Sequence, residues 1–210
     1  MKPADRVALF TRLQTANHHP TTELHYANPF QLLVAVILSA QATDKSVNLA
    51  TAPLFKTIRT PAALLALGHE RFEKAIRTIG LYRTKARNVM ATARTLDEQF
   101  GGEVPDRREA LESLPGVGRK TANVVLNTAF GQPTIAVDTH IFRVANRTGL
   151  APGKTPLEVE MKLLKAVPAA FRKDAHHWLI LHGRYVCKAR QPDCAHCIIV
   201  DLCAYGAKRV

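Results

Sequence analysis

A lysine and an aspartate, eighteen residues apart, are the side chains that could do covalent chemistry together. Lys120 lies in the first turn of an expected helix, and Asp138 stands in the run Val-Asp-Thr-His at 137–140. A neutral lysine amine is a nucleophile, and an ionised carboxylate can accept its proton or stabilise positive charge on a sugar. Because the lysine follows a glycine-rich turn suited to phosphate, the pair indicates chemistry on a nucleic-acid backbone.

The turn before the lysine reads Leu114-Pro115-Gly116-Val117-Gly118-Arg119. Glycine adopts positive φ at little cost, and proline fixes φ at the entry of the turn. Apolar residues at 122, 125, 126 and 129 then follow at helical spacing, and a short helix is expected before the turn. We therefore expect a helix-hairpin-helix over 107–130. The N–H groups that open its second helix would bind phosphate without reading base sequence, although a simple helix–helix corner needs the same glycines.

Each member of the pair also has a plainer interpretation. Lys120 could only bind phosphate, and Asp138 could only be the N-cap of the helix that follows it. The helix dipole disfavours the ammonium of Lys120 by about 0.3–1 kcal/mol, which is too little to neutralise it. We expect partial burial, the neighbouring Arg119 and proton transfer to a base to supply the remaining free energy that the neutral amine requires. For Asp138 the two roles are compatible, because the dipole keeps a capping carboxylate ionised.

The composition indicates a globular protein that binds a polyanion. The chain has 210 residues, is 47% hydrophobic, and carries 29 Lys and Arg against 17 Asp and Glu, a net charge of +12. The last fifty residues hold nine Lys and Arg against three Asp, which is half of the excess. The longest apolar run, Leu32 to Leu38, is too short to span a bilayer, and the N-terminus lacks the apolar core of a signal peptide. We expect a cytosolic protein that does not bind membranes.

All four cysteines lie close together, at Cys187, Cys194, Cys197 and Cys203. In a reducing compartment such a group favours metal ligation over disulfides. The spacing C-x6-C-x2-C-x5-C is neither that of a zinc ribbon nor that of a bacterial ferredoxin, and four thiolates suit zinc or a [4Fe–4S] cluster. The loop after the first cysteine contains Lys188 and Arg190, which could contact DNA phosphates.

Helix signals dominate the rest of the chain, and no segment alternates with a period of two, so the predicted fold is all-α. Proline, glycine and N-cap residues place the ends of these helices. The predicted helices outside the hairpin unit cover residues 4–16, 29–40, 43–58, 62–67, 70–78, 83–99, 139–147, 155–166 and 169–186.

These features resemble the helix-hairpin-helix DNA glycosylases, and most closely the bacterial endonuclease III family. The resemblance extends from residues 20–24 through 38–44 to Cys203, which is nearly the whole chain. It implies an all-α fold of two helical lobes. The first is a six-helix domain at 22–132 with the helix-hairpin-helix at 107–130, and the second is an iron–sulfur cluster domain formed by 1–21 plus 133–210. The resemblance also implies a DNA cleft between the lobes, with Lys120 and Asp138 on opposite sides.

The implied activity is base excision repair of oxidised or otherwise damaged pyrimidines. Lys120 would attack C1′ of the damaged nucleotide, the base would leave, and β-elimination from the resulting Schiff base would nick the strand. Such an enzyme is a bifunctional DNA N-glycosylase and abasic-site lyase. The family further implies a [4Fe–4S] cluster on the four cysteines, double-stranded DNA with a damaged base or abasic site as partner, a monomer, and a cytoplasmic, nucleoid-associated bacterial protein. A non-enzymatic DNA-binding module with a structural metal cluster is the alternative.

Excision requires the nucleotide to leave the base stack, which opens a gap in the duplex. Gln41 and Leu81 match the loops that fill this gap in the family, although Leu81 could equally be a core leucine. His140 matches a residue near the lesion, although it could be an ordinary surface histidine. The resemblance gives a DNA-binding set of Gln41, Leu81, Leu114, Gly116, Val117, Gly118, Arg119, His140, Lys188 and Arg190, and pocket residues Ser39 and Asp44.

Overall fold

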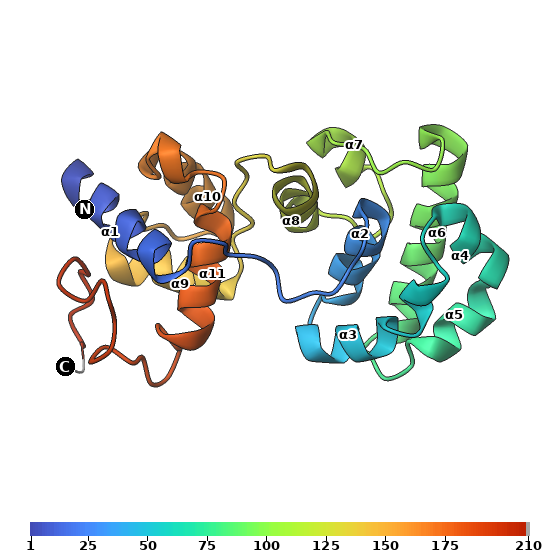
Figure 1. The fold of residues 1–210 in the computed structure, drawn as a ribbon, viewed down its shortest axis with the longest axis horizontal. Helices are drawn as coiled ribbons and strands as arrows, with labels where there is room; N and C mark the ends of the chain where they lie inside the picture. The colour runs from blue at the N-terminus through green and yellow to red at the C-terminus, as the bar shows by residue number, and fades with distance from the viewer. Residues whose placement is uncertain (209–210) are drawn as a thin grey trace. The chain divides into compact units, whose positions relative to one another are not determined.

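The computed structural model describes residues 1–208 and divides the chain into two compact units. Unit 1 consists of Met1–Thr22 and Gly131–Val210, and unit 2 of Glu23–Phe130. All regular secondary structure in the described residues is helical, which confirms the all-α prediction (Figure 1). Among these helices, none combines the length and the apolar character that a bilayer crossing requires.

Unit 2 is built around helix α2, whose nine residues from Phe30 to Leu38 are all buried. Helices α6 and α8 pack against α2, and α4 and α5 pack against α6. The unit contains α2 (Pro29–Leu38), α3 (Asp44–Thr51), η1 (Leu54–Lys56), α4 (Pro61–Leu67), α5 (His69–Ala75), α6 (Tyr82–Phe100), α7 (Arg108–Glu112) and α8 (Arg119–Phe130).

Side-chain caps open the helices of unit 2 where the sequence predicts them. The Thr43 hydroxyl accepts the N–H of Ser46 at 3.2 Å, and the Thr60 hydroxyl accepts the N–H of Ala63 at 3.1 Å. The predicted helix 43–58 is wrong in its second half, because α3 ends at Thr51 and a separate 3-10 turn follows. Pro53 accounts for the break, since it lacks the N–H that a continuing helix needs.

Unit 1 packs the first helix of the chain against the last ones. It contains α1 (Pro3–Ala16), α9 (Thr139–Thr148), α10 (Pro156–Ala166), η2 (Ala169–Phe171) and α11 (Ala175–Tyr185). The rings of Phe10, Phe171 and Trp178 meet in its core, with centroids 5.7 to 6.4 Å apart. The Arg12 guanidinium forms hydrogen bonds of 2.5 and 3.0 Å to the carboxylate of Asp201, which joins α1 to the C-terminal segment.

The predicted helix 169–186 is wrong in its first part. Phe171 and Asp174 form i to i+3 hydrogen bonds, with N–H to carbonyl distances of 3.0 and 3.2 Å, and the α-helix starts only at Ala175. The tighter turn places the Phe171 ring in the aromatic core, so tertiary packing overrides the helical pattern here.

Candidate functional site

The helix-hairpin-helix consists of α7, a tight turn and α8. The N–H of Val117 donates to the carbonyl of Leu114 at 3.1 Å, and Gly116 has a φ of +78°. Proline at the second position and a positive-φ glycine at the third are the features of a type II turn. The side chains of Leu114 and Val117 are buried, so they anchor the turn, and only the backbone there is available to a phosphate.

Helix α6 packs against this hairpin, a contact that the sequence pattern did not indicate. The Thr92 hydroxyl donates to the carbonyl of Pro115 at 2.7 Å. A Cβ atom on Gly116 would lie 2.8 Å from Nδ2 of Asn88, closer than real contacts allow. Glycine is therefore required at 116 both by φ and by close packing on α6.

Lys120 lies in the first turn of α8 and is exposed, while Arg119 before it is half-buried. The expected partial burial of the lysine is therefore wrong for the free protein. Exposure leaves the amine accessible to a substrate.

Asp138 is the N-cap of α9, as its plainer interpretation predicts. Its Oδ1 accepts the N–H of Ile141 at 2.8 Å, and its backbone carbonyl accepts the N–H of Phe142 at 2.8 Å. The side-chain bond occupies one of the two carboxylate oxygens and fixes the direction of the group. Lys120 belongs to unit 2 and Asp138 to unit 1.

His140, two residues after the cap, lies where α9 meets α11. A Cβ atom on Gly183 would lie 2.8 Å from Cβ of His140, so glycine permits this close approach. The ring Nδ1 lies 3.2 Å from Nη2 of Arg143, which also donates to the carbonyl of Gly183 at 2.7 Å. His140 is half-buried and oriented by these contacts, unlike a free surface histidine.

Gln41 and Leu81 share an unusual backbone conformation. Within residues 1–208 they are the two non-glycine residues with positive φ, at 54° and 59°. Left-handed backbone costs an ordinary residue about 1–2 kcal/mol. Leu81 is also 66% exposed, so its interpretation as a core leucine is wrong.

The turn that carries Gln41 lies between α2 and α3. It is closed by the N–H of Ala42, which donates to the carbonyl of Ser39 at 3.0 Å. The Ser39 hydroxyl donates to the carbonyl of Val36 at 2.8 Å, so it ends α2, and Asp44 is the half-buried first residue of α3. Gln41 itself is exposed.

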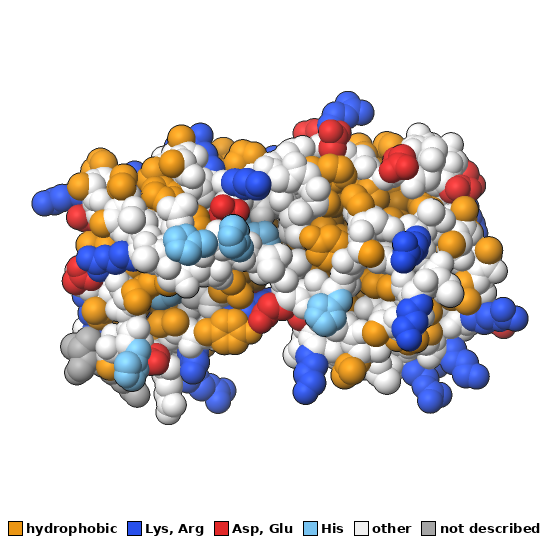
Figure 2. Space-filling view, viewed as in Figure 1, with side chains coloured by type: hydrophobic (Ala, Val, Ile, Leu, Met, Phe, Trp, Pro, Cys, Tyr) orange, Lys and Arg blue, Asp and Glu red, His pale blue; other side chains and the backbone are white. Residues whose placement is uncertain are grey.

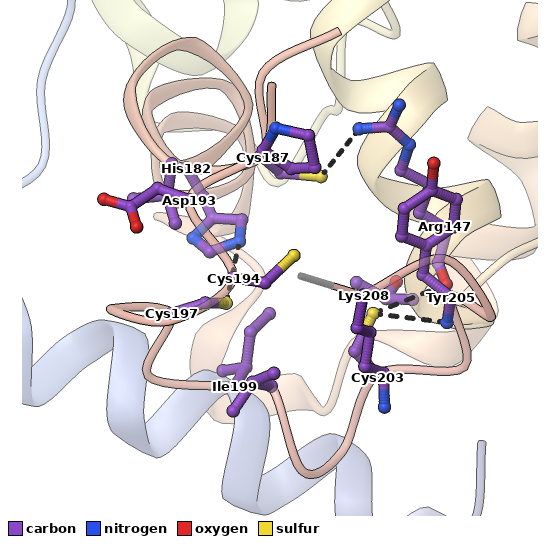
Figure 3. A pocket seen from close by; sticks show the side chains of 14 residues that line it. Arg147, His182, Cys187, Asp193, Cys194, Cys197, Ile199, Cys203, Tyr205 and Lys208 are labelled. Atoms are coloured by element: carbon purple, nitrogen blue, oxygen red, sulfur yellow. Dashed lines mark hydrogen bonds between the residues drawn. The ribbon is translucent and has the colours of Figure 1, made fainter. Parts of the chain in front are cut away.

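The four cysteines line one pocket in unit 1, together with His182, Arg147 and Tyr205 (Figure 3). Polar groups already lie near three of the sulfur atoms. Nη1 of Arg147 is 3.6 Å from Sγ of Cys187, the N–H of Tyr205 is 3.5 Å from Sγ of Cys203, and Nε2 of His182 is 3.8 Å from Sγ of Cys197.

Burial affects the titration of two groups in this pocket. It raises the pKa of the Cys197 thiol, and it lowers the pKa of His182 to about 4. Four ionised thiols could persist there only with positive charge or a metal among them. Across the described chain, no three His, Cys, Asp or Glu side chains converge closely enough to hold a single metal ion. The pocket nevertheless brings all four thiols, the donor set of an iron–sulfur cluster, to one place.

Helix α9 holds the loop that follows Cys187. Nε of Arg143 donates to the carbonyl of Cys187 at 2.8 Å, and Arg147 donates to the carbonyls of Lys188 and Ala189 at 2.7 and 2.8 Å. The side chain of Lys188 is exposed, as is that of Arg190. The same helix thus begins at the capping aspartate and braces the cysteine loop.

Basic side chains also gather outside the cysteine loop. On the face shown in Figure 2, Lys and Arg side chains stand along the edge of unit 2 formed by α3 and α5. Such a patch attracts a polyanion over several ångströms.

Comparison with known proteins decides the family. Residues 34–169 match the model of the HhH-GPD superfamily base excision DNA repair proteins. Over 208 residues the chain is 64% identical to Endonuclease III of Escherichia coli strain K12, and the alignment covers 99% of each protein. The chain belongs to the endonuclease III family. Endonuclease III of Haemophilus influenzae is 62% identical over the same length, with 99% of each protein covered.

Solved structures agree with the family assignment. A trapped Endonuclease III–DNA covalent intermediate superposes with a TM-score of 0.89 at 45% identity, covering 97% of this chain and 96% of that one. A non-covalent Endonuclease III–DNA complex gives the same TM-score and identity. The predicted resemblance is confirmed. The chain is a base-excision-repair DNA glycosylase, and the alternative of a non-enzymatic DNA-binding module is not favoured.

Proposed function

We propose that this chain, as a monomer, excises oxidised or ring-damaged pyrimidines from duplex DNA and then nicks the strand through Lys120. The observation that carries the proposal is an exposed amine one residue after the start of α8, next to a phosphate-binding hairpin, in an endonuclease III family member. The relative trapped as a covalent intermediate with DNA supports a mechanism in which a protein nucleophile bonds to DNA. We further propose that the protein acts in the bacterial cytoplasm, at the nucleoid.

The reaction begins with proton transfer from the Lys120 ammonium to a base, for which Asp138 is the candidate. Nζ then bonds to C1′, and the damaged base departs with the electron pair of the glycosidic bond and gains a proton. Opening of the sugar ring gives a Schiff base between Nζ and C1′. Loss of a C2′ proton expels the 3′ phosphate, and water finally hydrolyses the Schiff base and frees the lysine. The capped, ionised Asp138 also stabilises positive charge on the sugar.

Binding and eversion use the rest of the site residues. The backbone N–H groups of Gly116, Gly118 and Arg119 would bind phosphate, since that of Val117 closes the turn, and the Arg119 side chain would add a positive charge there. Gln41 and Leu81 would enter the gap that the everted nucleotide leaves, since both are exposed on loops of fixed conformation. His140, with Ser39 and Asp44, would contact DNA or the everted base. Several phosphate contacts would make binding fall steeply as salt increases.

The four cysteines are proposed to hold a [4Fe–4S] cluster with a structural role. The donor set supports it: four thiols line one pocket, and Arg147, the backbone N–H of Tyr205 and the ring of His182 lie near the sulfur atoms. When bound, the cluster supplies four metal–thiolate bonds that brace the C-terminal loop. Lys188 and Arg190 would then be presented to DNA phosphates on that braced loop.

Borohydride trapping on abasic-site DNA tests the proposal. Wild-type protein is expected to form a covalent adduct, which Lys120→Ala abolishes because the reducible Schiff base cannot form. Lys162→Ala is the matched control, because Lys162 is an exposed lysine on α10 that pairs with Glu158 at 2.6 Å. No adduct with the wild type would overturn the proposed lyase step, and an adduct that survives Lys120→Ala would assign the Schiff base to a different amine.

A further inference from the structure

Lys85 is a buried lysine that the catalytic scheme does not use. It lies in the first turn of α6, is only 5% exposed, and its Nζ donates to the backbone carbonyl of Leu38 at 2.9 Å. Leu38 is the last residue of α2, where helix carbonyls have no partner within the helix. The negative end of the helix dipole favours an ammonium at this place.

Lys85 forms hydrogen bonds at the ends of both loops that carry a positive-φ side chain, Gln41 in one and Leu81 in the other. Its backbone N–H donates to the carbonyl of Leu81 at 3.1 Å, which closes the first turn of α6. Its side chain holds Leu38, which directly precedes the turn Ser39–Ala42 that carries Gln41. One residue thus connects the loops of the two exposed, positive-φ side chains.

A strained backbone persists only where the surrounding structure fixes it. A buried ammonium is costly to leave without a partner, so the bond to Leu38 resists breaking and keeps the end of α2 at a set distance from the start of α6. Burial also lowers the pKa of the Lys85 ammonium, which is consistent with its enclosed position.

We propose that Lys85 is a positioning residue for base eversion: its bridge from α6 to the end of α2 sets the spacing of the Gln41 and Leu81 loops, so that both side chains enter the DNA gap together. This inference rests on the proposed function. It assigns to Lys85 no contact with DNA, because the side chain is buried.

The test compares two substrates under single-turnover conditions. One duplex carries an oxidised pyrimidine paired with a normal base, and the other carries a preformed abasic site, which leaves the stack at little cost. Lys85→Met keeps the length and apolar stem but removes the ammonium. It is expected to slow excision of the paired lesion about tenfold, the scale of one buried hydrogen bond to a charged group, while borohydride trapping on abasic DNA changes less than about threefold. Arg94→Met, an exposed charge on the same helix, is the control for loss of one positive charge.

A fluorescent base analogue at the lesion position reports eversion directly, and its signal should rise more slowly with Lys85→Met than with wild type. If thermal melting shows that Lys85→Met is unfolded, Lys85→Gln takes its place, because its shorter, neutral side chain removes the ammonium that bonds Leu38 while it leaves a polar group in the buried site, and the same difference between the two substrates is expected. Equal losses on both substrates, or no loss on the paired lesion, would overturn the inference and leave Lys85 as a packing residue. Failure of the wild type to form any adduct would instead remove the proposed function.

Discussion

The two glycines of the hairpin should differ sharply in what they tolerate, although the sequence makes them look alike. Gly116 has a φ of +78°, and a Cβ there would lie 2.8 Å from Nδ2 and 2.9 Å from Cβ of Asn88. Gly118 has no positive φ, and within the described residues no side chain or backbone atom beyond its immediate chain neighbours lies within 4 Å of an added Cβ. Alanine should therefore be costly at 116 and mild at 118.

The magnitude follows from two contributions at Gly116→Ala. The left-handed backbone costs about 1–2 kcal/mol, and displacement of Asn88, whose Cβ is fixed to α6, adds about 1–3 kcal/mol. We expect the free energy of unfolding to fall by about 2–5 kcal/mol, the sum of the two contributions. This lowers the melting temperature by roughly 2–4 °C for each kcal/mol in a chain of this size. Gly118→Ala should stay within about 1 kcal/mol of wild type, because lost unfolded-state entropy offsets a weaker helix start.

Urea unfolding followed by circular dichroism measures both variants, and DNA binding separates them further. Gly118→Ala should keep normal stability yet bind abasic DNA more weakly, because its new methyl group occupies the space through which a phosphate approaches. Similar stability losses for the two variants would refute the steric reasoning. Full DNA affinity in Gly118→Ala would argue against phosphate contact at this turn.

Other expectations follow from buried polar groups and from the cysteines. Thr92→Val should cost about 1–3 kcal/mol of stability by leaving the Pro115 carbonyl without its 2.7 Å partner, whereas Thr92→Ser keeps that bond and should cost less in the same urea titration. Burial lowers the pKa of His177 from its ordinary 6.5, so the unfolded chain binds more protons below that pH and stability falls as the pH drops. His177→Asn should flatten this decline between about pH 7 and about pH 5 in chemical melts, and an unchanged slope would contradict the assignment. Elemental analysis of purified protein should find iron and inorganic sulfide in equal amounts, reduced in Cys203→Ser, whereas zinc in their place would contradict a [4Fe–4S] cluster.

The sequence determined most of the local structure and the chemical groups. Proline and glycine at 115 and 116 encode the hairpin turn, Asp138 caps its helix, and four closely spaced cysteines meet in one pocket. These features depend on residues a few positions apart, whose geometry the backbone itself restricts. Two helix predictions were wrong in part. The predicted helix 43–58 is interrupted at Pro53, and the predicted helix 169–186 starts late because Phe171 packs in the aromatic core.

Tertiary structure alone decided which side chains support the site. Nothing in the sequence distinguishes Lys85 from the other lysines, because its partner, the carbonyl of Leu38, is 47 residues away and is reached only when α2 packs on α6. The sequence also gave no indication that Thr92 supports the hairpin, or that Leu81 and Lys120 are exposed. Burial and long-range hydrogen bonds depend on how helices pack, and local periodicity carries no information about a partner on a different helix.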